Sequence, residues 1–573
     1  MLVLLSGVMG ESPKPSALRP LARAGVALAL GFAVAACGNA ADSDRGTPAP
    51  GEGNAGSDGM GTSNGPGEMS GTVLECTPGR LPRRAVWLSE LQFARAITQL
   101  LGPAALDAEQ VPDAALKPLS QNGVGVNLSL LRKRLEQAGR ASASLEGRVA
   151  EVTGCAANDD TCARAFIAAL AAKAFRRPVL EAELADLNAV YDAGRETDLE
   201  MGVRLVVEAV IASSSFNYRT ELGTGAGAGA PVELTPHELA SMLSFWLTDS
   251  PPDSSLAGAA DSGALSDAAE LARQVDRLLA APEARDSLTH TLMSAWKLGN
   301  LFAASKDPAL FPEYGPLLQS DMFEETRLFL DRTLWGTGNL GEVLTSRTSF
   351  VNGALAGLYG VPFSGGDPSE LVEVELPATE RAGLLTQASL LSALARADDT
   401  SVVARGLFVR ASLLCLPGPP PKPEALLAQP QLFVMADLDE RESAEFRAAT
   451  SPCSGCHESM DPFGLLFESY DAIGRYRREL EGAPIDPNVS LDGAGFPGTF
   501  QGVVDFVDTA AESPDFSACV ARQLAVYATG DEGLRATDCE FGALRELPPS
   551  ETSLQQIIAG LASSALLRTR AGE

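Results

Sequence analysis

The sequence is short of histidine, aromatic residues and positive charge, and each shortage excludes a class of function. Among three His, His237 begins His-Glu but has no second His four residues later, so a metalloprotease motif is missing. The 44 Lys and Arg face 74 Asp and Glu, and the net charge of -30 argues against nucleic acid or anionic lipid as a partner. Aromatic residues make up 6%, whereas Ala and Leu are abundant, which favours a mainly α fold of several packed helical domains.

Long apolar runs are also missing. The candidate run, residues 24–34, follows Arg19 and Arg23 and is too short to span a bilayer as a stable helix. It leads into Val34-Ala-Ala-Cys37, which is similar to a bacterial lipobox with Cys37 as the lipidated residue; an ordinary signal peptide is the alternative. We therefore expect an extracytoplasmic protein that is lipid-anchored to a bacterial membrane, in the periplasm or at the cell surface.

Helix start signals and helical periodicity organise the rest of the chain. Ser89 and Gln92 have the spacing of a capping box, and so do Thr235 and Glu238. The predicted units are a lipoprotein signal peptide (1–37), a disordered tether (38–75), helical domains (76–145, 150–222 and 231–365), a cytochrome c-like haem module (378–485) and a C-terminal helical domain (492–573).

Arg176 and Arg177 stand directly before Pro178, at the end of a predicted helix. Two adjacent arginines can form an anion site. A basic helix C-terminus that complements the helix dipole before a proline is the interpretation we favour from sequence.

The pattern Cys453-Ser-Gly-Cys456-His457 carries the chemistry of the chain. Two thiols three residues apart on one helical turn can reach the two vinyl groups of a porphyrin edge, and the following His can become the proximal iron ligand. The alternatives are a Cys453–Cys456 disulfide or half of a zinc site. Zinc is the weaker alternative, because no second Cys-x-x-Cys and no His pair complete a tetrahedron.

The run CSGCHESMDPFGLLFESYDAIGRYR, residues 453–477, resembles the cytochrome-like module of the planctomycete-cytochrome-associated multidomain family. Residues 174–178 and 351–360 are similar to other domains of that family. The resemblance implies one covalent haem c and no assigned reaction. Relatives often carry a His upstream of the first haem cysteine, where this chain has Phe446.

The second axial ligand would decide the function of such a haem. Met460 lies one turn from His457 and cannot easily reach the opposite haem face. We therefore expect an upstream ligand or an open position; Met435 ranks first by chain proximity, followed by His237 or His290.

Several other side chains are candidates to support the haem. We expect Asp461 to accept the Nδ1–H of His457 and raise its basicity. Arg475, Tyr476 and Arg477 are candidates to bind the haem propionates, although a solvated helix end explains them equally well.

Six cysteines remain after Cys37, Cys453 and Cys456 are set aside, and an extracytoplasmic location predicts that they are oxidised. Local spacing favours the pairs Cys155–Cys162 and Cys519–Cys539. The remaining pair would then be Cys76–Cys415.

Together these patterns predict a monohaem c-type cytochrome-like protein that exchanges single electrons with an unidentified redox partner. An open-site haem enzyme with peroxidase-like activity is the first alternative, so whether the protein is an enzyme stays open. A non-haem surface protein that binds polysaccharide or protein is the second.

Overall fold

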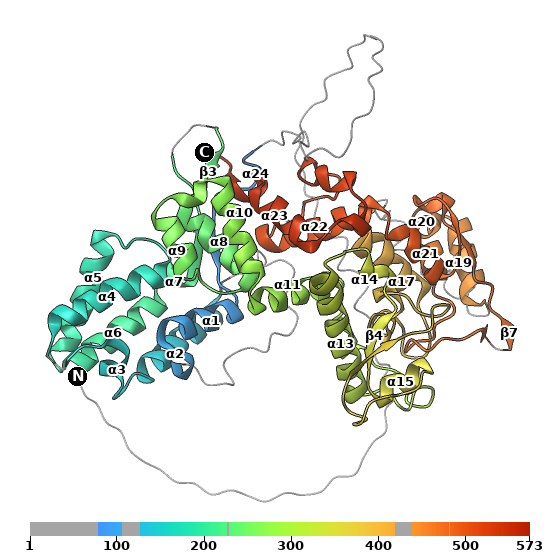
Figure 1. Cartoon of the computed structure of the whole chain (residues 1–573), viewed down its shortest axis with the longest axis horizontal. Coiled ribbons are helices and arrows are strands. Elements are labelled where there is room, and N and C mark those ends of the chain that lie inside the picture. Colours follow the sequence, from blue (N-terminus) through green and yellow to red (C-terminus); the bar gives the residue numbers. More distant parts are fainter. Residues whose placement is uncertain are drawn as a thin grey trace, which may run out of the picture. The chain divides into compact units, whose positions relative to one another are not determined.

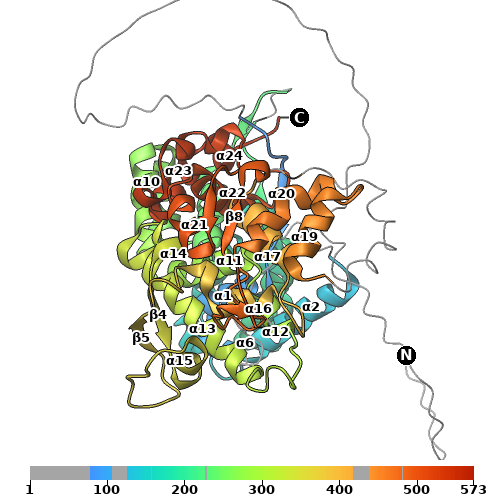
Figure 2. The same cartoon turned by 90° about the vertical axis from the view of Figure 1, so that its right-hand side faces the viewer.

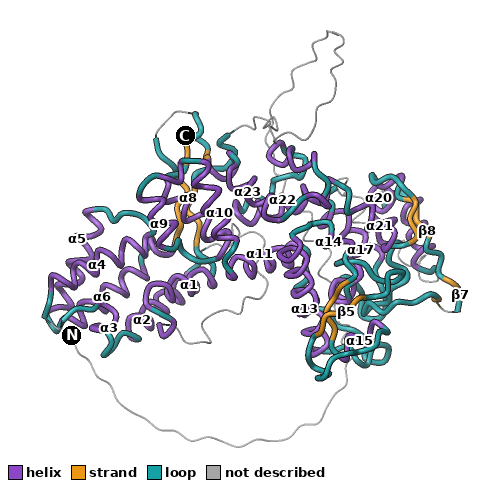
Figure 3. The backbone as a smooth tube through the Cα atoms, viewed as in Figure 1, coloured by secondary structure: helices purple, strands orange, loops and turns teal. Residues whose placement is uncertain are grey.

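The structure is a computed structural model that describes residues 78–105, 126–156, 158–225, 229–416, 418, 438–480 and 482–572. Within them the chain is mainly α-helical, as composition predicts, and its strands pair as two-stranded antiparallel ribbons (Figures 1 and 3). No helix of these residues is long and apolar enough to cross a membrane. The predictions for the signal peptide, the tether, Cys37, Cys76 and Met435 fall outside the described residues.

The first helical group surrounds a core of its own. Its helices are α1 (Glu90–Leu101), α2 (Leu128–Ala143), α3 (Val149–Thr153), α4 (Asp160–Phe175), α5 (Glu181–Arg195), α6 (Leu199–Ala212) and α7 (Ser214–Asn217). Helix α1 begins at the capping box of Ser89 and Gln92, as predicted. Buried apolar side chains from Leu88 to Phe216, together with Phe245, form one cluster, so residues on both sides of 145–150 share this core.

A second group combines helices from two distant parts of the sequence. It contains α8 (Pro236–Thr248), α9 (Ser254–Asp261), α10 (Ala268–Leu279), α11 (Pro282–Ala295), α22 (Pro514–Thr529), α23 (Leu554–Ser563) and α24 (Ala565–Arg568). The capping box of Thr235 and Glu238 starts α8, as predicted. Helix α23 packs on α10 and α22 packs on α11, which brings the red and green segments together in Figure 1.

A third group has a smaller core. It contains α12 (Asn300–Ala303), α13 (Pro316–Asp331), α14 (Glu342–Thr345), α15 (Gly353–Tyr359), α16 (Ala388–Ala393) and the ribbon of β4 (Thr348–Val351) with β5 (Val372–Glu375). A π-type turn at Arg332–Thr337 extends α13. Apolar residues of α12, α13, α15 and α16 meet in this core, together with Ala472 and Ile473.

The segment that carries the Cys-x-x-Cys-His motif forms a fourth group. Its helices are α17 (Val402–Leu407), α19 (Glu440–Ala449), α20 (Ser454–Leu465) and α21 (Val503–Ala510), and a π-type turn at Phe408–Leu413 follows α17. Its ribbons are β6 (Glu479–Leu480) with β7 (Ala483–Pro484) and β8 (Asn488–Ser490) with β9 (Thr499–Gln501). The buried side chains of α20 and α21 join the same core as those of α22 and α23.

Two further ribbons join segments that lie far apart in the sequence. Strand β1 (Arg84–Trp87) pairs with β2 (Tyr218–Glu221), and β3 (Val232–Glu233) pairs with β10 (Thr569–Arg570). The start, the middle and the end of the described chain therefore meet at these strands.

The disulfides confirm one prediction and correct two. Cys155 and Cys162 are bonded, as predicted. Cys415 is bonded to Cys519, so the predicted Cys519–Cys539 and Cys76–Cys415 pairs are wrong. Cys539 is disulfide-bonded too, but not to Cys519.

The reason for the two errors is the packing of α22. Its fully buried Cys519 faces the turn after α17, where Gln523, one helical turn later, donates through Nε2 to the Ser412 carbonyl at 2.6 Å. This packing brings the Cα atoms of Cys415 and Cys519 to 5.2 Å, within the range that a disulfide spans. Closeness in sequence therefore did not decide the pairing.

Candidate functional site

The Cys-x-x-Cys-His motif opens α20, as the spacing argument requires. Cys453 is the N-cap residue, and the amides of Cys456 and His457 both donate to its carbonyl, at 3.2 and 3.1 Å. Both cysteines are half-buried, and the structure forms no disulfide between them. The two thiols therefore lie one helical turn apart, which is the arrangement that thioether attachment to one porphyrin edge needs.

Backbone contact with a neighbouring helix fixes the position of α20. A Cβ atom at Gly464 would lie 1.9 Å from the Val402 carbonyl oxygen of α17. In the opposite direction, a Cβ atom at Gly406 of α17 would lie 2.2 Å from the Met460 carbonyl oxygen of α20. The two helices thus cross at glycines with no room for a side chain, while α19 packs against α20 as well (Figure 2).

A buried carboxylate orients the histidine of the motif. His457 lies one turn before Asp461, and its Nδ1 is 3.0 Å from Asp461 Oδ1. Asp461 is only 1% exposed, whereas the His457 side chain is 22% exposed. A carboxylate accepts hydrogen bonds, so this contact favours the tautomer with the proton on Nδ1, in which Nε2 has a lone pair that can bind a metal.

Arg447 completes this arrangement and was not among the residues that the sequence singled out. Its Nε donates to Asp461 Oδ2 at 2.7 Å from the last turn of α19. Its buried Nη2 has no hydrogen-bond partner among the described residues. Phe446, at the position where relatives often carry His, is half-buried next to it. No local pattern pointed to Arg447, because its role depends on how α19 packs against α20.

The residues proposed to bind propionates are engaged elsewhere. Arg475 forms an ion pair with Glu313, which lies before α13. Tyr476 packs edge-on against Tyr470, with ring centroids 5.6 Å apart, and Arg477 donates to a backbone carbonyl at 3.0 Å. None of these contacts is with the motif.

The upstream histidines make local contacts. His237 Nε2 lies 2.8 Å from Asp261 Oδ1, and His290 Nδ1 lies 2.7 Å from the Asp286 carbonyl oxygen of its own helix. These contacts give no indication that either ring approaches α20. Met435, ranked first as the second ligand, lies outside the described residues.

The donor set fits a covalent haem better than it fits zinc. Within the described ranges, no three His, Cys, Asp or Glu side chains converge as a group that could hold a metal ion. A covalent haem needs less from the protein at this point: two thiols outside disulfides and one imidazole with a fixed tautomer. The first turns of α20 supply these groups.

Comparison with protein families divides the chain into matched segments. Residues 162–221 match PSD5, residues 234–361 match PSD4 and residues 381–480 match PSCyt3, each described as a protein of unknown function (DUF1595, DUF1592 and DUF1588). These are domain families associated with planctomycete cytochromes. The PSCyt3 match contains α17, α19 and α20, and therefore the whole motif. No curated protein and no solved structure matched the chain.

Proposed function

We propose that this protein is a monohaem c-type cytochrome-like protein that exchanges single electrons with a redox partner. The His457–Asp461–Arg447 chain of contacts is the observation that carries the proposal. A histidine held by a buried carboxylate, directly after two thiols on one helical turn, is a ligand arrangement that a plain disulfide or a surface helix does not need. The PSCyt3 match over 381–480 supports the same conclusion.

Each residue has a distinct role in this proposal. Cys453 and Cys456 would hold the haem through thioether bonds, and His457 would bind its iron through Nε2. Asp461 keeps the proton on Nδ1 and increases electron donation from the ring. Arg447 balances the charge of the buried carboxylate and has a donor left, at Nη2, for a propionate.

A bound haem would supply a one-electron change at iron, which no side chain of the motif provides. The protein would determine the ligand field of the iron and would stabilise the change in charge that accompanies its oxidation or reduction. The surface charge also bears on the partner: a chain of net charge -30 favours encounter with a redox protein that presents a cationic surface.

The test is expression together with a c-type maturation system. The protein should gain the mass of one haem, keep haem-dependent peroxidase staining on a denaturing gel, and show a reduced-minus-oxidised spectrum. The double variant Cys453→Ala/Cys456→Ala should lose all three signals. The matched control Cys155→Ser/Cys162→Ser also removes two cysteines and should keep all three signals. An apo mass for the matured wild type would refute the proposal.

An open-site haem enzyme is the second candidate, and the same Asp461 contact favours it. A carboxylate on the proximal imidazole makes the histidine a stronger donor, which suits iron that works with an open sixth position. Cyanide or CO binding by the matured protein would support the enzyme. Loss of the weak long-wavelength band of a Met-ligated ferric haem in Met435→Ala would support the closed, electron-transfer form.

The proposal also includes an extracytoplasmic, lipid-anchored location. The disulfides of the described residues suit an oxidising compartment. Acyl labelling of the wild type should disappear in Cys37→Ser, which should also be released from membranes. Wild-type protein that is released without any change at Cys37 would contradict this location.

A further inference from the structure

A cavity of about 600 Å³ lies at the C-terminus of α4, beside β2 and the N-terminus of α8. A volume of this size accommodates a small organic ligand. Phe175, Pro178 and Tyr218 form an apolar and aromatic part of its wall, while Ser214 and Thr220 add hydroxyl groups. The cavity therefore combines an apolar surface with groups that can orient a polar body.

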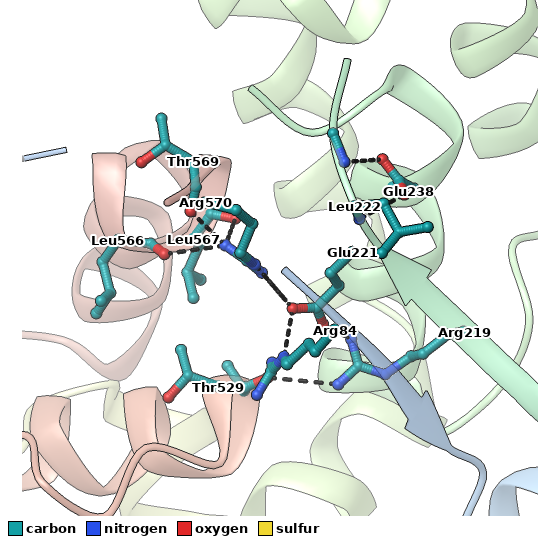
Figure 4. Close-up of polar contacts among 12 residues, drawn as sticks. Arg84, Arg219, Glu221, Leu222, Glu238, Thr529, Leu566, Leu567, Thr569 and Arg570 are labelled. Carbon is teal, nitrogen blue, oxygen red and sulfur yellow. Dashed lines mark hydrogen bonds and ion pairs between the residues drawn. The ribbon is translucent and has the colours of Figure 1, made fainter. Parts of the chain in front are cut away.

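The charged residues that line this cavity are mainly positive. Three arginines, Arg176, Arg177 and Arg219, and one glutamate, Glu238, line it. Arg177 is already paired with Glu183, at 2.7 and 2.9 Å, so Arg176 and Arg219 carry the charge that is left over. The Glu238 carboxylate accepts from the backbone amides of Leu222, at 2.7 Å, and of the next residue (Figure 4). In a protein of net charge -30 this concentration of guanidinium groups is unusual.

Arg176 brings a charge that no described carboxylate neutralises. Its guanidinium donates to the carbonyl oxygens of Ala174 at 2.8 Å, Ser215 at 2.9 Å and Tyr218 at 2.7 Å. Burial and the neighbouring arginines lower its pKa to about 9, but the group stays protonated at neutral pH. The sequence interpretation, a helix C-terminus that complements its dipole, accounts for only one of these bonds.

Arg219 belongs to a cluster in which three arginines share one acid. Glu221 is fully buried and binds Arg84, Arg219 and Arg570 (Figure 4). Burial would raise the pKa of Glu221, but the three guanidinium groups lower it well below its usual value. A single carboxylate cannot balance three cations, so positive charge remains beside the cavity.

Two buried polar groups of the lining are also unsatisfied. Ser241 Oγ and Arg219 Nε have no hydrogen-bond partner among the described residues, and the two residues are only 4% and 8% exposed. A buried donor without a partner costs free energy, and native proteins leave few of them. Both residues line the cavity, next to the N-terminus of α8, whose dipole also favours an anion.

We propose that this cavity binds a small organic anion with a carboxylate or phosphate head and a body about the size of a monosaccharide. The unsatisfied Arg219 Nε and Ser241 Oγ donate to the head group, while Arg176 supplies an uncompensated positive charge beside it. The aromatic and hydroxyl side chains that line the cavity contact the body of the ligand. The site is separate from the Cys-x-x-Cys-His motif, so it does not depend on haem.

Calorimetric titration with three compounds tests the inference. Glucuronate, glucose 6-phosphate and glucose share a pyranose body and differ in the head group. At least one of the two anions should bind, with an affinity that falls as salt is added, and glucose should not. The anion that binds better identifies the head. Equal binding of glucose, or no binding of either anion at millimolar concentration, would overturn the proposal.

Variants then locate the site. Arg219→Gln should weaken anion binding about tenfold to a hundredfold, as loss of a charge-assisted hydrogen bond does. The control Arg164→Gln removes the same charge from an exposed position of α4, where Arg164 pairs with Asp192, and should bind normally. Equal weakening by both variants would contradict the assignment.

If Arg219→Gln, which also loses its contact with Glu221, does not fold, Ser241→Ala provides an independent test. It removes one hydroxyl and no charge, and it should weaken binding about twofold to tenfold. Unchanged affinity in Ser241→Ala would then count against the site.

Discussion

Glu325 gives a quantitative prediction about pH and stability. It lies on α13, is fully buried, and contacts Ser349 Oγ and Tyr359 Oη, each at 2.7 Å. Burial raises the pKa of Glu325 from its ordinary value of 4.5 to about 7, against the opposing effect of the two hydroxyl groups. The folded protein therefore holds a proton at this site that the unfolded chain has already released at pH 6.

The sign and size of the effect follow from this difference. Because the folded pKa is the higher one, Glu325 contributes stability that is complete below pH 4.5 and is lost as the pH rises through about 7. At about 1.4 kcal/mol per pKa unit, the loss is on the order of 3 kcal/mol in the free energy of unfolding.

The assay is denaturant unfolding of wild type and Glu325→Gln at pH 5 and pH 8. The amide resembles the protonated acid, so the variant should lack the wild-type loss of about 2.5 kcal/mol between pH 5 and pH 8. Glu324→Gln is the control, because Glu324 is half-exposed and paired with Arg327. If the stabilities of the Glu325→Gln and wild-type proteins depend on pH in the same way, Glu325 does not have a pKa that burial raises to about 7.

Three further predictions concern the sites. Gly464→Ala should destabilise the protein by about 1–3 kcal/mol in denaturant unfolding, because the new Cβ atom would overlap the Val402 carbonyl oxygen; a wild-type midpoint would refute the contact. Glu221→Gln should cost about 3–5 kcal/mol in the same assay, since it removes the carboxylate that pairs with half-buried Arg84 and with buried Arg219 and Arg570, and a loss below 1 kcal/mol would contradict that account. Asp461→Asn should raise the midpoint potential of the matured protein by weakening donation from His457; an unchanged potential in redox titration would exclude this role.

Features that depend on neighbours in sequence were predictable. Ser89 and Thr235 cap their helices through bonds to residues three positions later, so spacing alone located both helix starts. Cys155 and Cys162 are seven residues apart and paired as expected. The contact between His457 and Asp461 was likewise visible as a separation of one helical turn.

Features that depend on packing between distant segments were not predictable. Arg447 reaches Asp461 only because α19 lies against α20. Cys519 meets Cys415 across 104 residues, and the shorter spacing to Cys539 was misleading. Arg219 and Arg570 come together at Glu221 across more than 300 residues. The sequence showed the basic pair of Arg176 and Arg177, but it could not show the cavity that these residues line together with Arg219.

Buried arginines explain how a mostly helical, acidic chain fixes the motif in place. Fully buried Arg405 of α17 donates to three backbone carbonyls of the turn at 467–471, which directly follows α20. Together with the backbone contact at Gly464, these bonds hold both the end and the side of α20 against one helix. The carbonyls of Phe467 and Asp471 thus accept from this buried side chain in addition to backbone amides of the same segment. Asp461, and through it the ring of His457, is therefore fixed by rigid elements on several sides, and the haem ligand that we propose for His457 would need such a fixed geometry in both oxidation states.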